Sequence, residues 1–188
     1  VVYGRRVGLH VAKNVDSVKL GELPHHADQP TADLIAGIKS STGTEKTGAL
    51  RRALAETMMT NCSIRRTVET MTKAKADVLD LRRRFQQVAI DDKGTVFNTD
   101  LTECLELGYM IDYSLAQIEG ALARYESRGA HLRLDAKDAE GKESALPRDD
   151  ANWLKHTFAF LKPDGTIALD FRPVYLCIDH PEDGWETD

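Results

Sequence analysis

Hydrophobic positions recur at helical spacing over most of the first two thirds of the chain. Residues 4–18 carry valines separated by steps of four and three, at Val7, Val11, Val15 and Val18. That spacing is the period of a helix with one apolar face. The pattern predicts a helix over 4–18.

Two further segments predict the first helices of a bundle. Residues 48–61 place Leu50, Leu54 and Met58 on one face and consist largely of good helix formers. A second helix is expected over about 65–88. Its apolar stripe, which only Lys75 interrupts, consists of Val68, Met71, Val78, Leu81, Phe85 and Val88.

A third long helix is predicted to start after Asn98, a good N-cap residue, and to run to about Tyr125. Its apolar positions are Leu101, Leu105, Gly108, Ile111, Leu115, Ile118, Leu122 and Tyr125. Two long striped helices joined by a short connection should pack antiparallel, with the 48–61 helix completing a three-helix layer. The stripes are interpreted as bundle core and not as a cofactor site.

The segments on either side of the bundle differ from it in composition. Residues 21–47 are rich in Pro, Ser and Gly, which predicts a linker, although the stretch TADLIAGIK within it has the composition of a short helix. His25 and His26 lie in this linker without a third ligand at useful spacing, so they are interpreted as solvated rather than metal-bound.

Beyond Gly129 the helical period ends. Residues 136–147 are polar without a period and predict a surface loop, and DDANWLKH predicts one or two helical turns led by Asp149 or Asp150. TFAFL and TIALDF, separated by KPDG, predict a β-hairpin. The expected fold class is therefore mainly α, with a three-helix bundle and a small β-hairpin.

Composition limits the classes of function. Lys and Arg number 25 against 30 Asp and Glu, for a net charge of -5, so no basic excess favours a nucleic-acid partner. No apolar stretch approaches the roughly 20 residues that span a bilayer. Cys62, Cys104 and Cys177 have no CxxC or CxxH spacing, which argues against a disulfide framework or a zinc site. The chain begins with Val1 rather than Met, and we interpret it as part of a longer polypeptide.

Motifs for self-sufficient chemistry are missing, since GxGxxG, GxxxxGK[ST], GxSxG and HExxH do not occur. The polar segment that most strongly suggests a functional site is ESRGAH, from Glu126 to His131, with Arg124 and Arg133 on either side. Cations at a helix C-terminus can simply cap its carbonyls and offset its dipole. Alternatively, Arg128 and His131 reach an anionic group on another domain, because arginine offers a planar fork of donors. The residues alone leave both explanations open.

Five stretches, in order, resemble the closing third of succinate dehydrogenase and fumarate reductase flavoproteins: VVYGRR, FNTDL, LELGYM, ARYESRGAHLRLD and RDDANWLKHTFAF. The likeness runs from Val1 to about Pro173. In that family an α/β FAD-binding domain is interrupted by a mobile capping domain and followed by a helical C-terminal domain. The resemblance implies that residues 1–20 are the last helix of the FAD-binding domain. It also implies a linker over 21–47, a bundle domain over 48–134, and a loop, short helix, hairpin and tail over 135–188.

The implied activity is FAD-dependent interconversion of succinate and fumarate, with electrons passing to an iron-sulfur subunit. The family's catalytic and flavin-attaching residues belong to regions before Val1. We therefore expect FAD to be bound mainly outside this chain, no catalytic or metal-binding residue here, and no turnover by the isolated chain. Arg128, His131 and Arg133 are expected to support the flavin site or the domain interface.

The resemblance also implies partners and a location. The expected partners are the FAD-binding and capping domains, the iron-sulfur subunit and, indirectly, membrane anchor subunits. These would place the protein at the cytoplasmic face of a bacterial membrane or the matrix side of a mitochondrial one. Two stretches depart from the family pattern, namely the long loop AKDAEGKESAL and the acidic end CIDHPEDGWETD.

Two other functions remain open. L-aspartate oxidase has a similar helical domain and an ESRG-type segment, although GAHLRLD and RDDANWLKHTFAF favour the succinate and fumarate branch. A free-standing helical protein-binding module is the alternative from a different class.

Overall fold

The computed structural model describes residues 2–174, which divide between residues 36 and 37 into two compact units. The first unit contains helix α1 (Val2–Asn14), which a short 3-10 helix (Val15–Ser17) continues. This confirms the helix predicted for 4–18. Nothing within this unit covers its apolar stripe, since Val7 and Val11 are 63% and 54% exposed.

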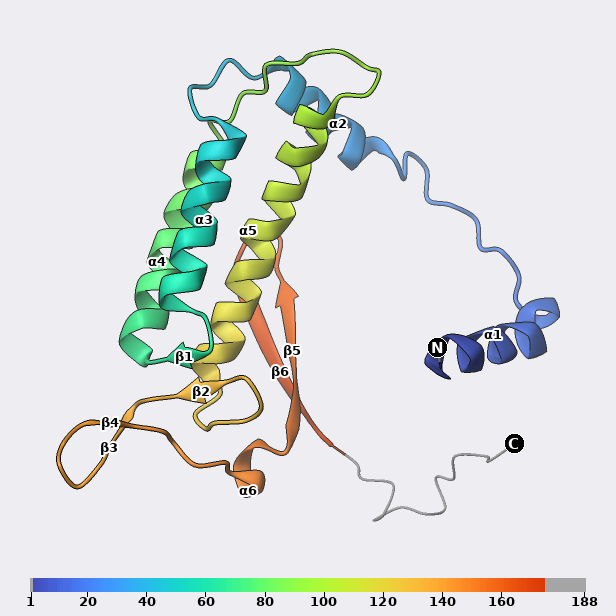
Figure 1. Ribbon diagram of the computed structural model, residues 1–188. Helices are drawn as coiled ribbons and strands as arrows, with labels where there is room; N and C mark the ends of the chain where they lie inside the picture. Colours follow the sequence, from blue (N-terminus) through green and yellow to red (C-terminus); the bar gives the residue numbers. More distant parts are fainter. Residues whose placement is uncertain (1, 175–188) are drawn as a thin grey trace. The chain divides into compact units, whose positions relative to one another are not determined.

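Helix α2 (Gln29–Ser40) crosses the division between the two units and contains the predicted TADLIAGIK helix. The remaining elements, in chain order, are α3 (Thr47–Asn61), β1 (Arg65–Arg66), α4 (Val68–Phe85), α5 (Thr99–Ala123), β2 (Leu132–Arg133), β3 (Ala136–Lys137), β4 (Glu143–Ser144), α6 (Asp150–Trp153), β5 (Lys155–Leu161) and β6 (Ile167–Pro173). Figure 1 shows α3, α4 and α5 side by side, with the β5–β6 hairpin lying along α5. The predicted mainly α class with a small hairpin is confirmed.

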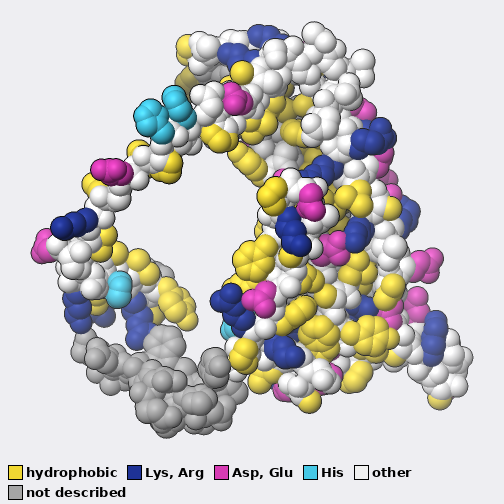
Figure 2. Space-filling model, turned by 180° about the vertical axis from the view of Figure 1, so that it is seen from behind, with side chains coloured by type: hydrophobic (Ala, Val, Ile, Leu, Met, Phe, Trp, Pro, Cys, Tyr) yellow, Lys and Arg dark blue, Asp and Glu magenta, His cyan; other side chains and the backbone are white. Residues whose placement is uncertain are grey.

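The main core lies between the three bundle helices. Its fully buried members include Leu50 and Leu54 from α3, Met71, Ala74, Val78 and Leu81 from α4, and Leu107, Ile111, Leu115 and Ile118 from α5. Burying each large apolar side chain contributes roughly 1.5–3 kcal/mol relative to its exposure in water. Most positions of the predicted stripes are therefore bundle core, although Val68 at the start of α4 is 46% exposed. At the surface, Figure 2 shows hydrophobic side chains interspersed with charged ones.

Helix α4 is shorter than the predicted span of 65–88. Thr67 forms its N-cap, because the Thr67 Oγ1 accepts from the Thr70 N–H at 3.1 Å and the Thr70 Oγ1 accepts from the Thr67 N–H at 3.1 Å. Arg65 and Arg66 instead form strand β1, which pairs in parallel with β2. The predicted start was wrong because the segment 65–66 has a distant strand partner that no local pattern reveals.

Helix α5 starts as predicted, with the Asn98 Oδ1 accepting from the Leu101 N–H at 2.8 Å. Its predicted stripe is only partly correct. Cys104 and Leu107 are buried while Tyr125, beyond the end of the helix, is 54% exposed. Because α5 contacts α3, α4 and both hairpin strands, it buries more than one narrow stripe.

The predicted linker contains residues that pack on the bundle. Ile38 is buried with Val88, Ile90 and Cys104 in a second small core. The Arg84 guanidinium donates to both oxygens of Glu45, from Nε at 2.7 Å and from Nη2 at 3.0 Å. The last part of the predicted linker, from residue 37 to 47, is therefore fixed to the bundle. The predicted domain boundaries themselves stay a prediction.

Two of the three arginines near the end of α4 bind neighbouring segments of the chain. The Arg82 Nη1 donates to the Gly165 carbonyl at 2.5 Å, and Nη2 lies 3.2 Å from the Asp112 carboxylate. The Arg83 side chain is 76% exposed, as a solvated face would be. Arg82 and Arg84 therefore fix neighbouring segments to the end of α4.

The two predicted strands of the hairpin are confirmed. β5 and β6 pair antiparallel from Lys155–Pro173 to Leu161–Ile167, around the KPDG turn. The predicted surface loop 136–147 was wrong in one respect, because β3 and β4 form a two-residue antiparallel ladder within it. The Asp138 carboxylate accepts from the Glu140 and Lys142 N–H groups and so closes this turn.

Candidate functional site

The cluster that the sequence singles out forms where α5 ends. The Arg133 side chain is fully buried and caps the helix, since its Nη1 donates to the carbonyls of Ala121 at 2.8 Å, Leu122 at 3.2 Å and Arg124 at 2.9 Å. Its Nε donates to the Asp135 carboxylate at 2.6 Å. A cation in this position satisfies carbonyls that the helix leaves free and offsets the helix dipole. Of the two explanations offered for these cations, Arg133 therefore fits the first, in which a cation caps the carbonyls at the end of a helix.

Glu126 is the centre of the cluster, with no exposed side-chain surface. Its carboxylate accepts from the Arg124 Nη1 at 2.6 Å, from the Arg128 Nε and Nη2 at 2.7 and 3.1 Å, and from the Asp149 N–H at 2.8 Å. Burial alone would raise the pKa of Glu126. The hydrogen bonds from Arg128, Asp149 and Arg124 outweigh burial, so the pKa lies below its ordinary value.

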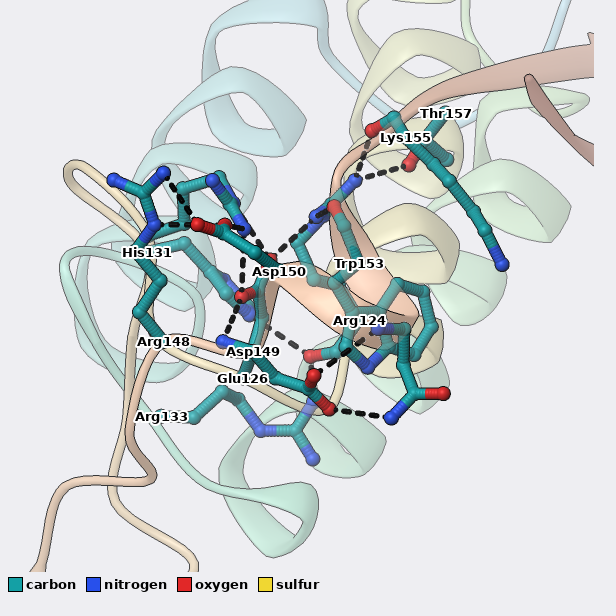
Figure 3. Close-up of polar contacts among 12 residues, drawn as sticks. Arg124, Glu126, His131, Arg133, Arg148, Asp149, Asp150, Trp153, Lys155 and Thr157 are labelled. Atoms are coloured by element: carbon teal, nitrogen blue, oxygen red, sulfur yellow. Dashed lines mark hydrogen bonds and ion pairs between the residues drawn. The ribbon is translucent and has the colours of Figure 1, made fainter. Parts of the chain in front are cut away.

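Arg128 joins this centre to helix α6. Its Nη2 also donates to the Asp150 carboxylate at 2.6 Å, which Arg148 binds through both oxygens at 2.8 Å. Hydrogen bonds from Arg148 and Arg128 lower the pKa of Asp150 to about 2. The preceding residue, Asp149, is the N-cap of α6 and accepts from the Asn152 N–H at 3.0 Å, so of the two residues predicted to lead this helix it is Asp149 that caps it. Figure 3 shows how Glu126, Asp149 and Asp150 lie among the arginines.

His131 bridges two segments that are far apart in the sequence. Its Nδ1 lies 2.8 Å from the Arg66 Nη1, and its Nε2 lies 3.1 Å from the Arg124 carbonyl. Because a guanidinium can only donate, we assign Nδ1 as the acceptor and place the proton on Nε2. Burial lowers the pKa of His131, as do the Arg66, Arg133 and Arg124 charges, while the hydrogen bond to the Arg124 carbonyl opposes the shift.

A tight turn holds Arg128 and His131 together. Each residue's N–H donates to the other's carbonyl at 3.0 Å, and Gly129 between them adopts a φ of 58°. Few residues other than glycine take that conformation without strain. The turn places Arg128 against Glu126 and His131 against Arg66.

The predicted site residues Arg128, His131 and Arg133 thus belong to one polar network. Sequence reasoning missed Arg66 and the central role of Glu126. The position of Glu126 between two arginines is the only feature of the sequence that hints at its burial. No feature of the sequence indicates that Arg66 contacts His131. The network consists of ion pairs and backbone caps, so its chemistry is to hold a fixed arrangement rather than to activate a nucleophile.

The other candidates are not part of this network. His25 and His26 lie in the first unit with ring centroids 4.9 Å apart, and no group able to hold a metal occurs among residues 2–174. Cys62 and Cys104 are buried free thiols, while Cys177 lies outside the described residues. No helix within residues 2–174 is both long and apolar enough to span a bilayer.

Comparison with known proteins identifies the family. Residues 51–182 match the family model described as the C-terminal part of the fumarate reductase flavoprotein. The fumarate reductase flavoprotein subunit of a Serratia species is 36% identical over 182 residues, covering 94% of this chain and 29% of that protein. The succinate dehydrogenase flavoprotein subunit of Rickettsia bellii is 30% identical over 181 residues, covering 94% of this chain and 28% of that protein.

A solved quinol-fumarate reductase with menaquinol molecules contains a similar chain. It is 35% identical with a TM-score of 0.80, and the likeness covers 94% of this chain and 30% of that one. The chain thus spans less than a third of the length of these relatives. The matched segment includes all of the bundle except the first residues of α3, and it includes the polar network around Glu126. The chain therefore belongs to the family of fumarate reductase flavoprotein C-terminal domains.

Proposed function

We propose that this chain is the C-terminal helical domain of a longer flavoprotein subunit that interconverts succinate and fumarate. The observation that carries the proposal is the likeness to fumarate reductase and succinate dehydrogenase subunits over 94% of the chain. These relatives favour the succinate and fumarate reaction over that of L-aspartate oxidase. A likeness that extends on both sides of the bundle also argues against a free-standing module.

FAD is the cofactor that this proposal implies, and the described residues do not by themselves fit it. The chain has no glycine-rich dinucleotide motif. The arginines near His131 are mostly engaged with Glu126, Asp150 and backbone carbonyls. We therefore assign FAD binding and hydride transfer to the remainder of the longer subunit, and no step of the reaction to residues of this chain.

The proposed role of Arg128, His131 and Arg133 is to support the flavin site or the interface with the FAD-binding domain. Arg133 and Glu126 fix the end of α5, and the Gly129 turn then presents Arg128 and His131 at the surface of the second unit. The Arg128 Nη1 has no hydrogen-bond partner among residues 2–174, so it can donate to an acceptor on a neighbouring domain.

The proposed assembly follows from the same likeness. One solved relative is a quinol-fumarate reductase with menaquinol molecules. We propose an iron-sulfur subunit as the electron partner, membrane anchor subunits as indirect partners, and a peripheral location at the cytoplasmic face or the mitochondrial matrix side. Residues 1–20 would then be the last helix of the FAD-binding domain, residues 21–47 the connection, and residues 48–134 the bundle domain.

The experiment is an activity assay on two polypeptides. The full-length subunit, purified with its natural partners, should contain flavin and should oxidise succinate or reduce fumarate with an artificial electron carrier. The 188-residue chain should do neither. A full-length subunit that binds flavin but turns over neither dicarboxylate would refute the proposed activity while leaving the family membership intact.

A further inference from the structure

A pocket of about 450 Å³ opens beside His131, between the C-terminal half of α5, strand β1 and the start of β5. Its walls carry four cations and two imidazoles, from Arg66, Arg124, Arg128, Lys155, His131 and His156. No Asp or Glu lines it. Figure 3 shows Arg124, Lys155 and Thr157 together at one side of this region. A pocket with walls of one charge sign favours a ligand of the opposite sign.

Some of these cations are already engaged within the fold. The Arg124 Nη1 and Nη2 donate to Glu126, to the Thr157 hydroxyl and to two backbone carbonyls, so Arg124 acts as a structural group. Arg128 uses Nε and Nη2 in the same way but keeps Nη1 available. The excess charge of the pocket must therefore come from its other cations.

Arg66 and Lys155 supply that excess, because neither forms an ion pair with a carboxylate of residues 2–174. Within residues 2–174 the Arg66 guanidinium donates only to the Ser63 and Cys62 carbonyls and to His131. The pocket has four cationic side chains, and the nearby carboxylates of Glu126 and Asp150 can neutralise two of them. Two positive charges therefore stay uncompensated. This occurs in a chain whose net charge is -5.

We propose that this pocket binds a carboxylate group, held by Arg66, Lys155 and the free Nη1 of Arg128. Arg128 binds the Glu126 carboxylate through Nε and Nη2, so Nη1 is the nitrogen of its guanidinium that can donate to a second carboxylate. The proposal does not depend on the function proposed above, because it rests on the charges of the pocket alone.

The carboxylate could come from this chain or from a separate molecule. Residues 175–188 contain five acidic residues and no Lys or Arg. The Val174 N–H donates to the Leu154 carbonyl at 3.2 Å, one residue before Lys155, so that acidic sequence follows directly on a residue next to the pocket. Asp179 is within about 17 Å of Val174 at full extension of the backbone.

His131 provides a readout for binding. Its Nδ1 accepts from Arg66, and the charges facing it are Arg66 on β1, Arg124 at the end of α5, Arg133 on β2 and Lys155 on β5, with His156 lining the same pocket. Glu126 lies behind the arginines that it pairs with. A bound carboxylate adds negative charge and competes for Arg66, so binding should raise the pKa of His131.

The test is a titration of the 188-residue chain with citrate, followed by NMR of the His131 ring and the β5 amides, against sodium chloride at equal ionic strength. Citrate should cause saturable shifts that chloride does not. Arg66→Gln and Lys155→Gln should each weaken binding by about tenfold, as expected for loss of a charged hydrogen bond. Arg51→Gln, which removes an exposed cation on α3, should change binding by less than about twofold. Shifts that chloride reproduces, or equal affinity in all three variants, would overturn the proposal.

A fourth variant identifies the source of the carboxylate. It neutralises the acidic residues of the last segment as Asp179→Asn, Glu182→Gln, Asp183→Asn, Glu186→Gln and Asp188→Asn. If the chain's own carboxylates occupy the pocket, this variant should bind citrate several-fold more tightly than the original chain and show a lower His131 pKa. Equal citrate affinity in the two chains, with binding still dependent on Arg66, assigns the pocket to a carboxylate of a separate molecule.

Discussion

Arg128 binds both carboxylate oxygens of Glu126, at 2.7 and 3.1 Å, and Glu126 has no exposed side-chain surface. The pair closes the segment between α5 and α6, because Glu126 also accepts from the Asp149 N–H. A buried carboxylate with several donors is costly to remove, since its partners then stay buried without a counter-charge. The fixed geometry of the ESRGAH segment thus depends on Glu126 more than on the residues at its surface.

Glu126→Ala should destabilise the chain strongly. Loss of one partner of a buried ion pair costs about 3–5 kcal/mol, against less than about 1 kcal/mol for an exposed pair. The matched control is Glu106→Ala, whose partner Arg51 lies on the surface. Urea unfolding followed by circular dichroism measures both free energies. Similar losses in the two variants would contradict the central role of Glu126.

His131 should make stability depend on pH below its ordinary pKa of 6.5. Its pKa is lower in the folded chain than in the unfolded chain, so the unfolded chain binds more protons in this window. The contribution is therefore present above pH 6.5 and is lost as the pH falls through the folded pKa. Glu126 acts separately, because its lowered pKa affects stability only below its ordinary value of 4.5.

The measurement is the free energy of unfolding against pH for the original chain and for His131→Gln. The variant should lose part of the dependence between pH 6.5 and the folded pKa of His131, and should keep the steeper loss below 4.5. Parallel curves for the two chains would show that His131 is not the titrating group.

Gly43 should tolerate no side chain. A Cβ at this position would overlap the Gln87 carbonyl, and that backbone is fixed because the Glu45 N–H donates to the same carbonyl at 3.0 Å. Gly43→Ala should cost about 1–3 kcal/mol, as other overpacked sites do. Gly48→Ala, in the first turn of α3 with open space around it, should be neutral or stabilise by up to about 1 kcal/mol. Thermal unfolding of both variants measures the difference, and equal melting temperatures would refute it.

Arg128→Ala in the full-length subunit should lower flavin content more than it lowers the melting temperature. The reason is that Arg128 offers its free Nη1 to a neighbouring domain, while Arg124 and the Asp149 N–H keep two of the hydrogen bonds to Glu126. Flavin absorbance per polypeptide and thermal unfolding are measured on the same sample. Arg148→Ala is the control, because Arg148 binds Asp150 but lies 62% exposed. Unchanged flavin in Arg128→Ala would remove the proposed supporting role.

The sequence predicted the helices and the hairpin because each has a local signal. The bundle helices repeat their apolar residues at helical spacing, and Asn98 and Asp149 are recognisable N-caps. The predicted start of α4 was too early, because Arg65 and Arg66 form a strand that pairs with residues 132–133. Local patterns carry no information about such a distant partner.

The site was predicted in part for the same reason. Arg128, His131 and Arg133 share one short segment, so their proximity was visible in the sequence. The contact between Arg66 and His131 joins residues 65 positions apart and depends on how β1 pairs with β2. The position of Glu126 between two arginines was visible, but its hydrogen bond from the Asp149 N–H, 23 positions away in the sequence, was not.

The most direct test of the account is the mass and flavin content of the native polypeptide, captured from its source with an antibody against the bundle. We expect a flavin-bearing polypeptide more than three times as long as this chain, accompanied by an iron-sulfur protein. A flavin-free polypeptide of 188 residues with no flavin-binding chain beside it would contradict the proposal that this domain completes a succinate or fumarate flavoenzyme.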